Sequence, residues 1–430
     1  MIVPGPPQSW NATPVDELLE VEDCALCPRP ATPYVACGCD AMRWTRANAS
    51  NVRGFSATAW FTGAALLRQT AATRRVPIGL IRASMGGTPI QLWSSPTALR
   101  ACGAVSPGRP FWRPYSSLFW SMIFPLRGLR FAAMTWFQGE ANVGPDRSTP
   151  PNWGTGPTGP RDYACQLPAM LSDWRRVLSA PTLPVLVVEL SAYCNEYDTH
   201  TFLTHCDQRT SHLSVSNSHL PALRHAQAAA LNLSHVYMVP NHDLGSLHPV
   251  SGSIHSAKKP QLGTRIALST LAALTERTAA STAAVWDGPV AVSAHLDPKC
   301  AEISRMVPPY IKQCVVVAFA MVPGAGALHL DEGARCPEDV LPFYCNGTEL
   351  VSGSGFELYG HDAEGGRWHA ASYAQLSASA INSVVLGIGD MMVTAPTRVR
   401  YAWADWPVTS VRNGPEGHSL PARIFDIVVT

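Results

Sequence analysis

Two hydrophobic patterns divide the chain. Between residues 56 and 279, segments whose apolar positions recur with the period of a helix alternate with short apolar runs typical of buried strands. We expect helices at 56–71, 163–177, 221–231 and 262–274, and strands at 77–83, 131–137, 183–190 and 236–239. This alternation predicts an α/β domain with a parallel sheet that is covered by helices on both faces.

The pattern changes after Ser281. Short runs rich in β-forming residues, separated by glycine and proline turns, occur at 290–296, 314–321, 356–359, 383–388, 399–403 and 424–429. Such runs predict an all-β sandwich or barrel. We place the boundary within residues 279–288, which gives an α/β domain over residues 1–283 and a smaller β-sandwich domain over residues 284–430.

Charge and hydropathy exclude two classes of partner. Lys and Arg total 32 and Asp and Glu total 31, a net charge of +1, with no basic stripe or acidic run. This balance argues against nucleic acid and anionic membranes as partners. The longest apolar run, from Cys314 to Leu328, contains Pro323 and is too short to span a bilayer, so we expect no membrane span.

Cysteine content indicates the compartment. The 12 cysteines are a high and even number, which favours disulfides and a secreted or lysosomal protein. Four glycosylation sequons agree with this compartment, at Asn11, Asn48, Asn232 and Asn346. The stretch Met1–Gly5 has no charged region followed by an apolar one, so we expect any signal peptide to lie outside this chain.

A cysteine cluster near the N-terminus has two interpretations. The cluster consists of Cys24, Cys27, Cys37 and Cys39. Disulfides or free thiols are one interpretation and a zinc site is the other. The spacing matches no common zinc finger, which favours the first.

Three polar or glycine-rich loops follow predicted strands. Gly86-Gly87-Thr88 follows the strand ending near Ala83, Gln138-Gly139-Glu140 follows the strand ending at Phe137, and the loop leading to His255 follows the strand ending at Val239. Loops at the carboxyl ends of parallel strands meet at one edge of the sheet. The sequence therefore predicts a single site built from all three loops.

The residue types in these loops suit ester hydrolysis. Gly86 and Gly87 allow backbone N–H groups to approach a developing oxyanion. The Gln138 amide is a candidate second donor, and Glu140 is a candidate to orient that donor or to bind a substrate hydroxyl. Each motif taken alone is also typical of a simple solvated turn. Histidine is the usual general base for a serine nucleophile, and spacing alone does not separate His248 from His255.

Several motifs closely resemble the sialate O-acetylesterase family, and the similarity runs from about Phe55 to Phe425. The matching segments are Val76–Ile81, Gly86–Ile90, Trp93–Ser95, Trp136–Asn142, Leu171–Arg175, Arg224–Gln227, Arg400–Trp403 and Trp406-Pro407. The resemblance implies a three-layer hydrolase domain of SGNH type. It also implies that Gly86, Gly87, Gln138, Glu140 and Asn142 form the oxyanion and substrate-binding side of the site.

The resemblance also favours one of the two histidines. In this family an Asp-Leu-Gly or Asp-Leu-Cys segment precedes a Ser-Ile-His or Asp-Ile-His segment, which is followed by a lysine and then an arginine. Asp243-Leu244-Gly245, Ser253-Ile254-His255, Lys259 and Arg265 match that order, whereas His248 lacks the following lysine. We therefore predict His255 as the catalytic base. Asp243 is the candidate orienting acid, and a Ser-His dyad without an acid is the alternative.

The nucleophile has no counterpart in the sequence. The family carries it in a Gly-Gln-Ser-Asn segment at the end of the first strand of the catalytic domain, and no such segment occurs here. Ser9 and Ser84 are weak candidates, because neither has the expected neighbours. Met1-Ile2-Val3 resembles the family's second strand. We therefore expect the nucleophile's strand to precede residue 1.

The resemblance implies a substrate class and no metal or organic cofactor. The expected reaction is hydrolysis of O-acetyl esters on sialic acids. A non-catalytic glycan-binding protein that keeps the pocket is the contrasting hypothesis. An acetylesterase acting on another acetylated carbohydrate, such as xylan, is the alternative within the enzyme class.

Overall fold

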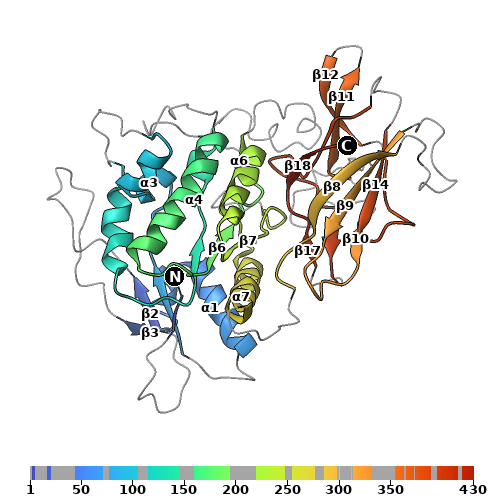
Figure 1. Ribbon diagram of the computed structural model, residues 1–430. Helices are drawn as coiled ribbons and strands as arrows, with labels where there is room; N and C mark the ends of the chain where they lie inside the picture. Colours follow the sequence, from blue (N-terminus) through green and yellow to red (C-terminus); the bar gives the residue numbers. More distant parts are fainter. Residues whose placement is uncertain are drawn as a thin grey trace, which may run out of the picture. The chain divides into compact units, whose positions relative to one another are not determined.

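The computed structural model describes most of the chain and divides it into two compact units (Figure 1). The described residues are 2–4, 17–20, 44–70, 77–104, 115–144, 159–193, 219–246, 254–276, 285–297, 300, 311, 313–331, 354–362, 365–371, 373–388, 395–414 and 419–430. Unit 1 comprises Met1–Leu190, Leu223–Val239 and Lys258–Thr282, and unit 2 comprises Ser191–Ala222, Pro240–Ala257 and Ala283–Thr430. The predicted boundary after residue 283 remains a prediction.

Unit 1 contains a buried parallel sheet. Strands β5 (Met134–Trp136), β6 (Val185–Val188) and β7 (Val236–Val239) pair in the order β5-β6-β7. Every residue of β6 and β7 is buried, as expected for strands whose two faces are both covered. The structure confirms these three predicted strands: β7 has the predicted bounds, and β5 and β6 are shorter than predicted.

A second sheet of unit 1 has mixed pairing. Its strands are β1 (Ile2–Pro4), β2 (Glu17–Glu20), β3 (Thr45–Arg46) and β4 (Ile78–Arg82), in the order β1-β4-β2-β3. Only β2 and β4 run parallel. The sequence predicted one parallel sheet that includes β4. Among the described strands, β4 instead belongs to a separate sheet.

Helix starts in unit 1 differ in how they are capped. In α3 (Pro96–Ala101), the Ser95 hydroxyl accepts the Ala98 N–H at 3.1 Å, and Pro96 stands at the first position, where its missing N–H costs nothing. The long helix α4 (Pro160–Val177) likewise begins with a proline. The short helix α2 (Ile90–Trp93) follows Pro89, which supplies no side-chain cap.

Two helices cross closely in unit 1. Helix α1 (Ala57–Thr70) packs along α7 (Lys259–Glu276) (Figure 1). Gly263 of α7 lies against Phe61 of α1. A Cβ atom at position 263 would lie 2.6 Å from the Phe61 backbone carbon, so only glycine permits this approach. Helix α4 packs against α2, α3 and the 3₁₀ helix η7 (Ala228–Asn232), which follows α6 (Leu220–Gln227).

Unit 2 contains three antiparallel sheets around a common core. One sheet has the order β13-β14-β9-β8, from Tyr373–Leu376, Ser383–Ile388, Gln313–Ala320 and Val290–Asp297. The second has the order β12-β11-β15-β18, from Gly365–Ala370, Phe356–Asp362, Arg398–Tyr401 and Phe425–Val428. The third is small, with the order β10-β16-β17, from Leu328–Leu330, Val411–Asn413 and Leu420–Pro421.

Alternate residues of these strands build the core of unit 2. Val315 and Val317 of β9 pack in one cluster with Leu358 of β11 and Val399 of β15, and all four are fully buried. The two larger sheets therefore share one hydrophobic layer. The structure confirms the predicted β-rich C-terminal part.

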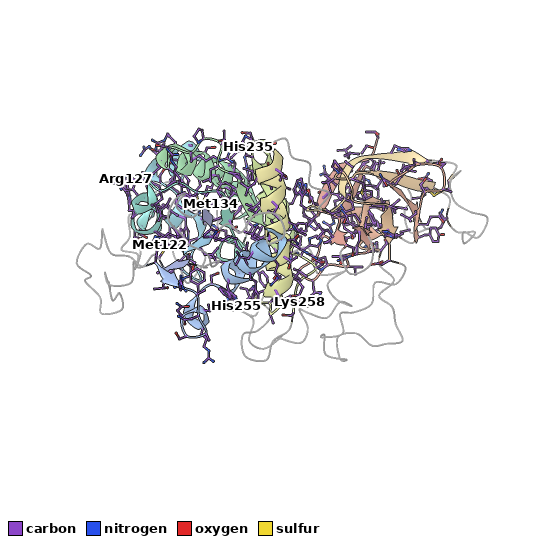
Figure 2. The ribbon with its side chains drawn as sticks, turned by 90° about the horizontal axis from the view of Figure 1, so that it is seen from below. Met122, Arg127, Met134, His235, His255 and Lys258 are labelled. Carbon is purple, nitrogen blue, oxygen red and sulfur yellow. A yellow bond between two sulfur atoms is a disulfide. The ribbon has the colours of Figure 1, made fainter. Side chains whose placement is uncertain are left out.

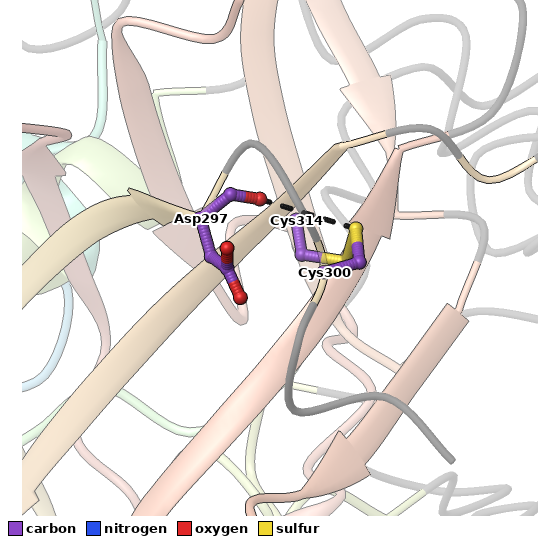
Figure 3. The surroundings of a disulfide bond; sticks show 3 residues. All are labelled: Asp297, Cys300 and Cys314. Atoms are coloured by element: carbon purple, nitrogen blue, oxygen red, sulfur yellow. Dashed lines mark hydrogen bonds between the residues drawn. A yellow bond between two sulfur atoms is a disulfide. The ribbon is translucent and has the colours of Figure 1, made fainter. Parts of the chain in front are cut away.

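Two disulfides occur within the described residues, as the cysteine content predicted. Cys102, next to the end of α3, is bonded to Cys165 of α4. Cys300 is bonded to Cys314 of β9, close to Asp297 (Figure 3). The cluster from Cys24 to Cys39 lies outside the described residues. None of the described helices is long and apolar enough to cross a membrane.

Candidate active site

A cavity of about 280 Å³ lies in unit 1 beside the ends of β4 and β5. Its wall includes Ser84 and Thr88 from the loop after β4, Gln138 from the loop after β5, Trp136 from β5 itself, and Thr62 from α1. Two of the three predicted loops therefore meet at this cavity. The wall combines polar and apolar side chains, as is common in pockets that bind small organic groups.

The loop after β4 is a tight turn closed by its own side chain. Gly87 has a φ of +67°, a conformation that favours glycine, and Gly86 and Gly87 are both exposed. The buried Thr88 hydroxyl donates to the Met85 carbonyl at 2.7 Å and accepts the Trp93 Nε1–H at 3.0 Å. These bonds fix a loop whose glycine backbone remains accessible.

The loop after β5 is tied to the loop after β4 through Gln138. The Gln138 Nε2 donates to the Thr88 carbonyl at 3.0 Å and to Asn142 Oδ1 at 2.8 Å. The Tyr163 hydroxyl, which comes from α4, donates toward the Gln138 Oε1 at 3.1 Å. Gln138 is only 8% exposed, so these bonds form away from bulk water. Two loops separated by about fifty residues are held together by one side chain.

Asn142 links the same network to helix α2. Its Oδ1 accepts the Ile90 N–H at 2.9 Å, and its Nδ2 donates to Gln91 Oε1 at 3.1 Å. Ile90 is the first residue of α2, and the N–H groups in the first turn of a helix have no carbonyl partner within that helix. Asn142 therefore supplies the cap that Pro89 cannot supply.

A half-buried lysine lies close to the end of the chain segment that leads into the loop after β5. Lys259, the first residue of α7, places its Nζ 5.3 Å from the centre of the Phe137 ring. Burial lowers the pKa of Lys259, because it disfavours the charged form, and the negative charge of Glu140 partly opposes this shift. Glu140 is thereby connected electrostatically with the start of α7.

The predicted base His255 belongs to unit 2 and is exposed. It precedes Lys258 by three residues, and Figure 2 labels both just before α7. Backbone and hydroxyl contacts hold the segment that follows it: Ser256 donates to the Leu244 carbonyl, and the Ala257 N–H donates to Ser246 at 2.7 Å. The segment after β7 therefore supports the chain next to His255.

The predicted acid Asp243 is engaged by an arginine. Arg412 Nη2 donates to Asp243 Oδ2 at 2.9 Å, and the Asp243 side chain is 6% exposed. The Asp243 carboxylate is therefore bonded to Arg412 of β16. The role of Asp243 as the acid that orients His255 remains a prediction.

Three candidate residues remain, and the structure describes one of them. Ser84 is exposed on the wall of the cavity. His248 and Ser9 lie outside the described residues. The structure joins Gln138 and Asn142 to Thr88, which follows Gly86 and Gly87, in one hydrogen-bonded assembly within unit 1.

Sequence reasoning missed Tyr163, Gln91 and Trp93 as members of this assembly. The sequence predicts Tyr163 as part of a helix, but the apolar pattern of that helix does not indicate that the Tyr163 hydroxyl contacts Gln138. Only the packing of α4 against the loop after β5 reveals the contact.

The fold and the site define an α/β protein with a loop-built cavity, followed by a β-rich part. A model of the family described as carbohydrate esterase, sialic acid-specific acetylesterase, matches residues 38–272, more than half of the chain. The chain therefore belongs to this family.

Individual relatives agree with this assignment. The sialate O-acetylesterase of Homo sapiens is 33% identical over 148 residues, which take in 31% of this chain and 24% of that protein. The Rattus norvegicus sialate O-acetylesterase is 28% identical over 197 residues, or 35% of this chain and 33% of that protein. The matched region thus spans only a quarter to a third of these relatives.

A solved structure shares the fold. The crystal structure of a carbohydrate acetylesterase from Xanthomonas citri superposes with a TM-score of 0.63 at 22% identity, covering 96% of this chain and 73% of that chain. At this identity the likeness supports the two-part α/β and β-rich architecture.

Proposed function

We propose that the site of this chain acts on O-acetyl esters of sialic acids by a serine-esterase mechanism. Membership of the sialic acid-specific acetylesterase family supports the substrate class. The observation that carries the proposal is the bond from Gln138 to the Thr88 carbonyl, which holds the glycine loop beside the cavity. The finer architecture that we propose is an SGNH-type three-layer domain over residues 1–283 and a β sandwich over residues 284–430.

The proposed chemistry assigns one role to each loop. A serine Oγ attacks the acetyl carbonyl carbon while the imidazole of His255 takes the hydroxyl proton. The Gly87 N–H and the Gln138 amide stabilise the oxyanion that forms on the carbonyl oxygen. The intermediate then expels the sugar oxygen, which receives the proton from His255. Water hydrolyses the acetyl-serine ester by the same steps and releases acetate.

The lack of a recognisable nucleophile serine limits the esterase activity that we propose for this chain. No serine in the sequence stands in a Gly-Gln-Ser-Asn segment, and Ser84, although exposed on the cavity wall, follows Ala83 in a different loop. We propose that the chain as given has little esterase activity. The same absence favours the second candidate function, a glycan-binding protein without catalysis. A different acetylated carbohydrate is the alternative substrate, and a secreted or lysosomal location is proposed from the disulfides.

Acetate release from 9-O-acetylated sialic acid, followed by proton NMR, tests this proposal. We expect slow release, because sites without their nucleophile keep roughly 10³-fold catalysis over water. Gln138→Leu, which removes a proposed oxyanion donor, should reduce that rate further, because the residual catalysis comes from the oxyanion donors and binding. His361→Ala, which changes an exposed histidine, should leave the rate unchanged.

Two results would change the account in different ways. Release at the buffer rate for every variant would overturn hydrolysis and leave only glycan binding. Rapid release together with fluorophosphonate labelling that disappears in Ser84→Ala would show that the nucleophile is present, and would overturn the proposal of low activity.

A further inference from the structure

The direction of the Gln138 amide can be deduced from its neighbours. The nitrogen and oxygen ends of an amide look alike in shape, so their assignment depends on hydrogen-bond partners. Three groups around this network have a character fixed by chemistry: the Ile90 N–H only donates, the Thr88 carbonyl only accepts, and the Trp136 indole N–H only donates.

The first two of these groups fix Asn142 and the nitrogen end of Gln138. Because the Ile90 N–H donates to Asn142 at 2.9 Å, the Asn142 atom at that point is its oxygen. Gln138 approaches the same oxygen at 2.8 Å and the Thr88 carbonyl at 3.0 Å, and both contacts require a donor. The Gln138 amide nitrogen therefore faces the glycine loop, and both of its hydrogens are engaged there.

The third group fixes the oxygen end. The Trp136 indole donates to the Tyr163 hydroxyl at 3.2 Å, so the single hydrogen of that hydroxyl is directed at another group. Two oxygens of Gln138 lie within its reach, the backbone carbonyl at 3.0 Å and Oε1 at 3.1 Å. Gln227 Nε2 also approaches the same backbone carbonyl, at 3.3 Å. Tyr163 is thus the donor that meets the oxygen end of the amide.

Burial makes this arrangement costly to reverse. Tyr163 is 1% exposed and Asn142 is 1% exposed. A reversed Gln138 amide would place its oxygen against the oxygens of Thr88 and Asn142, so the Gln138 oxygen and the Thr88 carbonyl would face each other without this donor, away from water. Burial also raises the pKa of Tyr163, so its hydroxyl keeps the hydrogen that it donates.

We propose that Tyr163 and Asn142 are positioning residues that clamp the Gln138 amide from its two ends and aim its hydrogens at the Gly86–Thr88 loop. Asn142 acts at the nitrogen end and Tyr163 at the oxygen end. Under the proposed function this arrangement presets the donor of the oxyanion site. In the resting protein the two amide hydrogens are used by Thr88 and Asn142, so Gln138 must release or share one of them to serve a substrate.

Solvent exchange of the Gln138 side-chain amide tests the clamp without substrate or turnover. Protein labelled with ¹⁵N in glutamine side chains gives the signals, and the pair absent from Gln138→Glu identifies position 138. In the unmodified protein we expect these hydrogens to exchange at least about 100-fold more slowly than those of the exposed Gln69. Exchange as fast as that of Gln69 would overturn the proposal even if no variant folds.

Variants separate positioning from general loosening. Tyr163→Phe should speed Gln138 exchange about 10-fold, the equivalent of one lost hydrogen bond, and leave the buried Gln166 of the same helix unchanged. Tyr115→Phe is the matched control, because the Tyr115 hydroxyl is buried and has no hydrogen-bond partner among the described residues. Equal acceleration of Gln138 and Gln166, or equal effects of the two tyrosine variants, would overturn the proposed role of Tyr163.

The other end of the clamp has a conservative rescue. Asn142→Asp keeps an acceptor for Ile90 and Gln138, so Gln138 should remain protected, whereas Asn142→Leu should release it. Similar exchange in the two variants would contradict the role of Asn142. Because exchange is measured on the free protein, failure of this test would leave the proposed function standing, and absence of esterase activity would leave the clamp standing.

Discussion

At the residue scale, buried amides hold the candidate site together. Asn142 alone serves three partners, which are Ile90, Gln91 and Gln138, and it is 1% exposed. Buried polar groups that lose a partner keep their full desolvation cost, whereas exposed ones rebind water. The site should therefore be sensitive to single substitutions that leave the hydrophobic core unchanged.

Asn142→Ala should lower the free energy of unfolding by about 3 kcal/mol, because it leaves two buried donors and one acceptor without Asn142. Urea denaturation measures the change. Asn232→Ala, at an exposed position, should change stability by less than about 0.5 kcal/mol. Equal effects at the two positions would show that the network contributes no stability.

The second prediction at this scale concerns pH. His369 of β12 lies 3.4 Å from Asp362 and is 9% exposed, and burial lowers its pKa despite the opposing effect of that carboxylate. The unfolded chain therefore takes up the proton first as the pH falls below about 6.5. Stability that is present above that pH should be lost progressively on acidification.

Thermal unfolding between about pH 7.5 and pH 5 checks this direction. We expect the midpoint of the wild-type protein to fall more than that of His369→Gln, which has no proton to gain. His361→Gln, on the same hairpin but exposed, serves as the control. A drop as large in His369→Gln as in the wild-type protein would assign the acid sensitivity to other groups.

The sequence indicated many of the site residues but not their connections. Gly86, Gly87, Gln138 and Asn142 stand in recognisable loops, and the sequence predicted that these loops meet, although β4 and β5 belong to different sheets among the described strands. The hydrogen bond from Tyr163 to Gln138 joins residues 25 positions apart on different elements. No local pattern encodes such a contact, since it depends on how α4 packs.

At the element scale, periodic segments were predictable and irregular ones were not. The predicted helix at 56–71 is α1 (Ala57–Thr70), and the predicted strand at 383–388 has the same bounds in β14. The segment Phe119–Leu126 was not predicted, and it forms a π-helical turn followed by a 3₁₀ turn. Pro125 interrupts any regular helix there, so no long apolar period develops.

Gly263→Ala should lower the free energy of unfolding by about 2 kcal/mol, although alanine is normally favoured over glycine in a helix by about 1 kcal/mol. The added Cβ would lie 2.6 Å from backbone and side-chain carbons of Phe61 in α1, and backbone cannot move aside cheaply. Chemical denaturation measures the effect.

Gly54→Ala, away from this helix crossing, is the control substitution for Gly263→Ala. A Cβ at position 54 would meet nothing within 4 Å, so this substitution should be close to neutral. A stabilising effect of Gly263→Ala would show that α1 and α7 do not approach as closely as described.

At the scale of the whole molecule, each unit has a covalent link of its own. The bond between Cys102 and Cys165 closes a separation of 63 residues in unit 1, and the bond between Cys300 and Cys314 closes 14 residues in unit 2. Longer closed loops lose more entropy in the unfolded chain. The first bond should therefore stabilise its unit more than the second.

The double variant Cys102→Ser, Cys165→Ser should lose about 4 kcal/mol of unfolding free energy, against about 3 kcal/mol for Cys300→Ser, Cys314→Ser. Denaturation followed separately for the two units checks the order. No loss in the first variant would mean that the crosslink is not formed in the purified protein.

The central claim is that unit 1 presents an acetyl-recognising site of the sialic acid-specific acetylesterase type. Saturation-transfer NMR of the purified chain with 9-O-acetylated sialic acid tests it most directly, with the non-acetylated sugar as the control. We predict strong transfer to the acetyl methyl group, weak transfer to the non-acetylated sugar, and loss of both in Gly87→Val, whose side chain would disfavour the positive φ of the loop. Equal transfer to the two sugars, or transfer that survives Gly87→Val, would contradict the account.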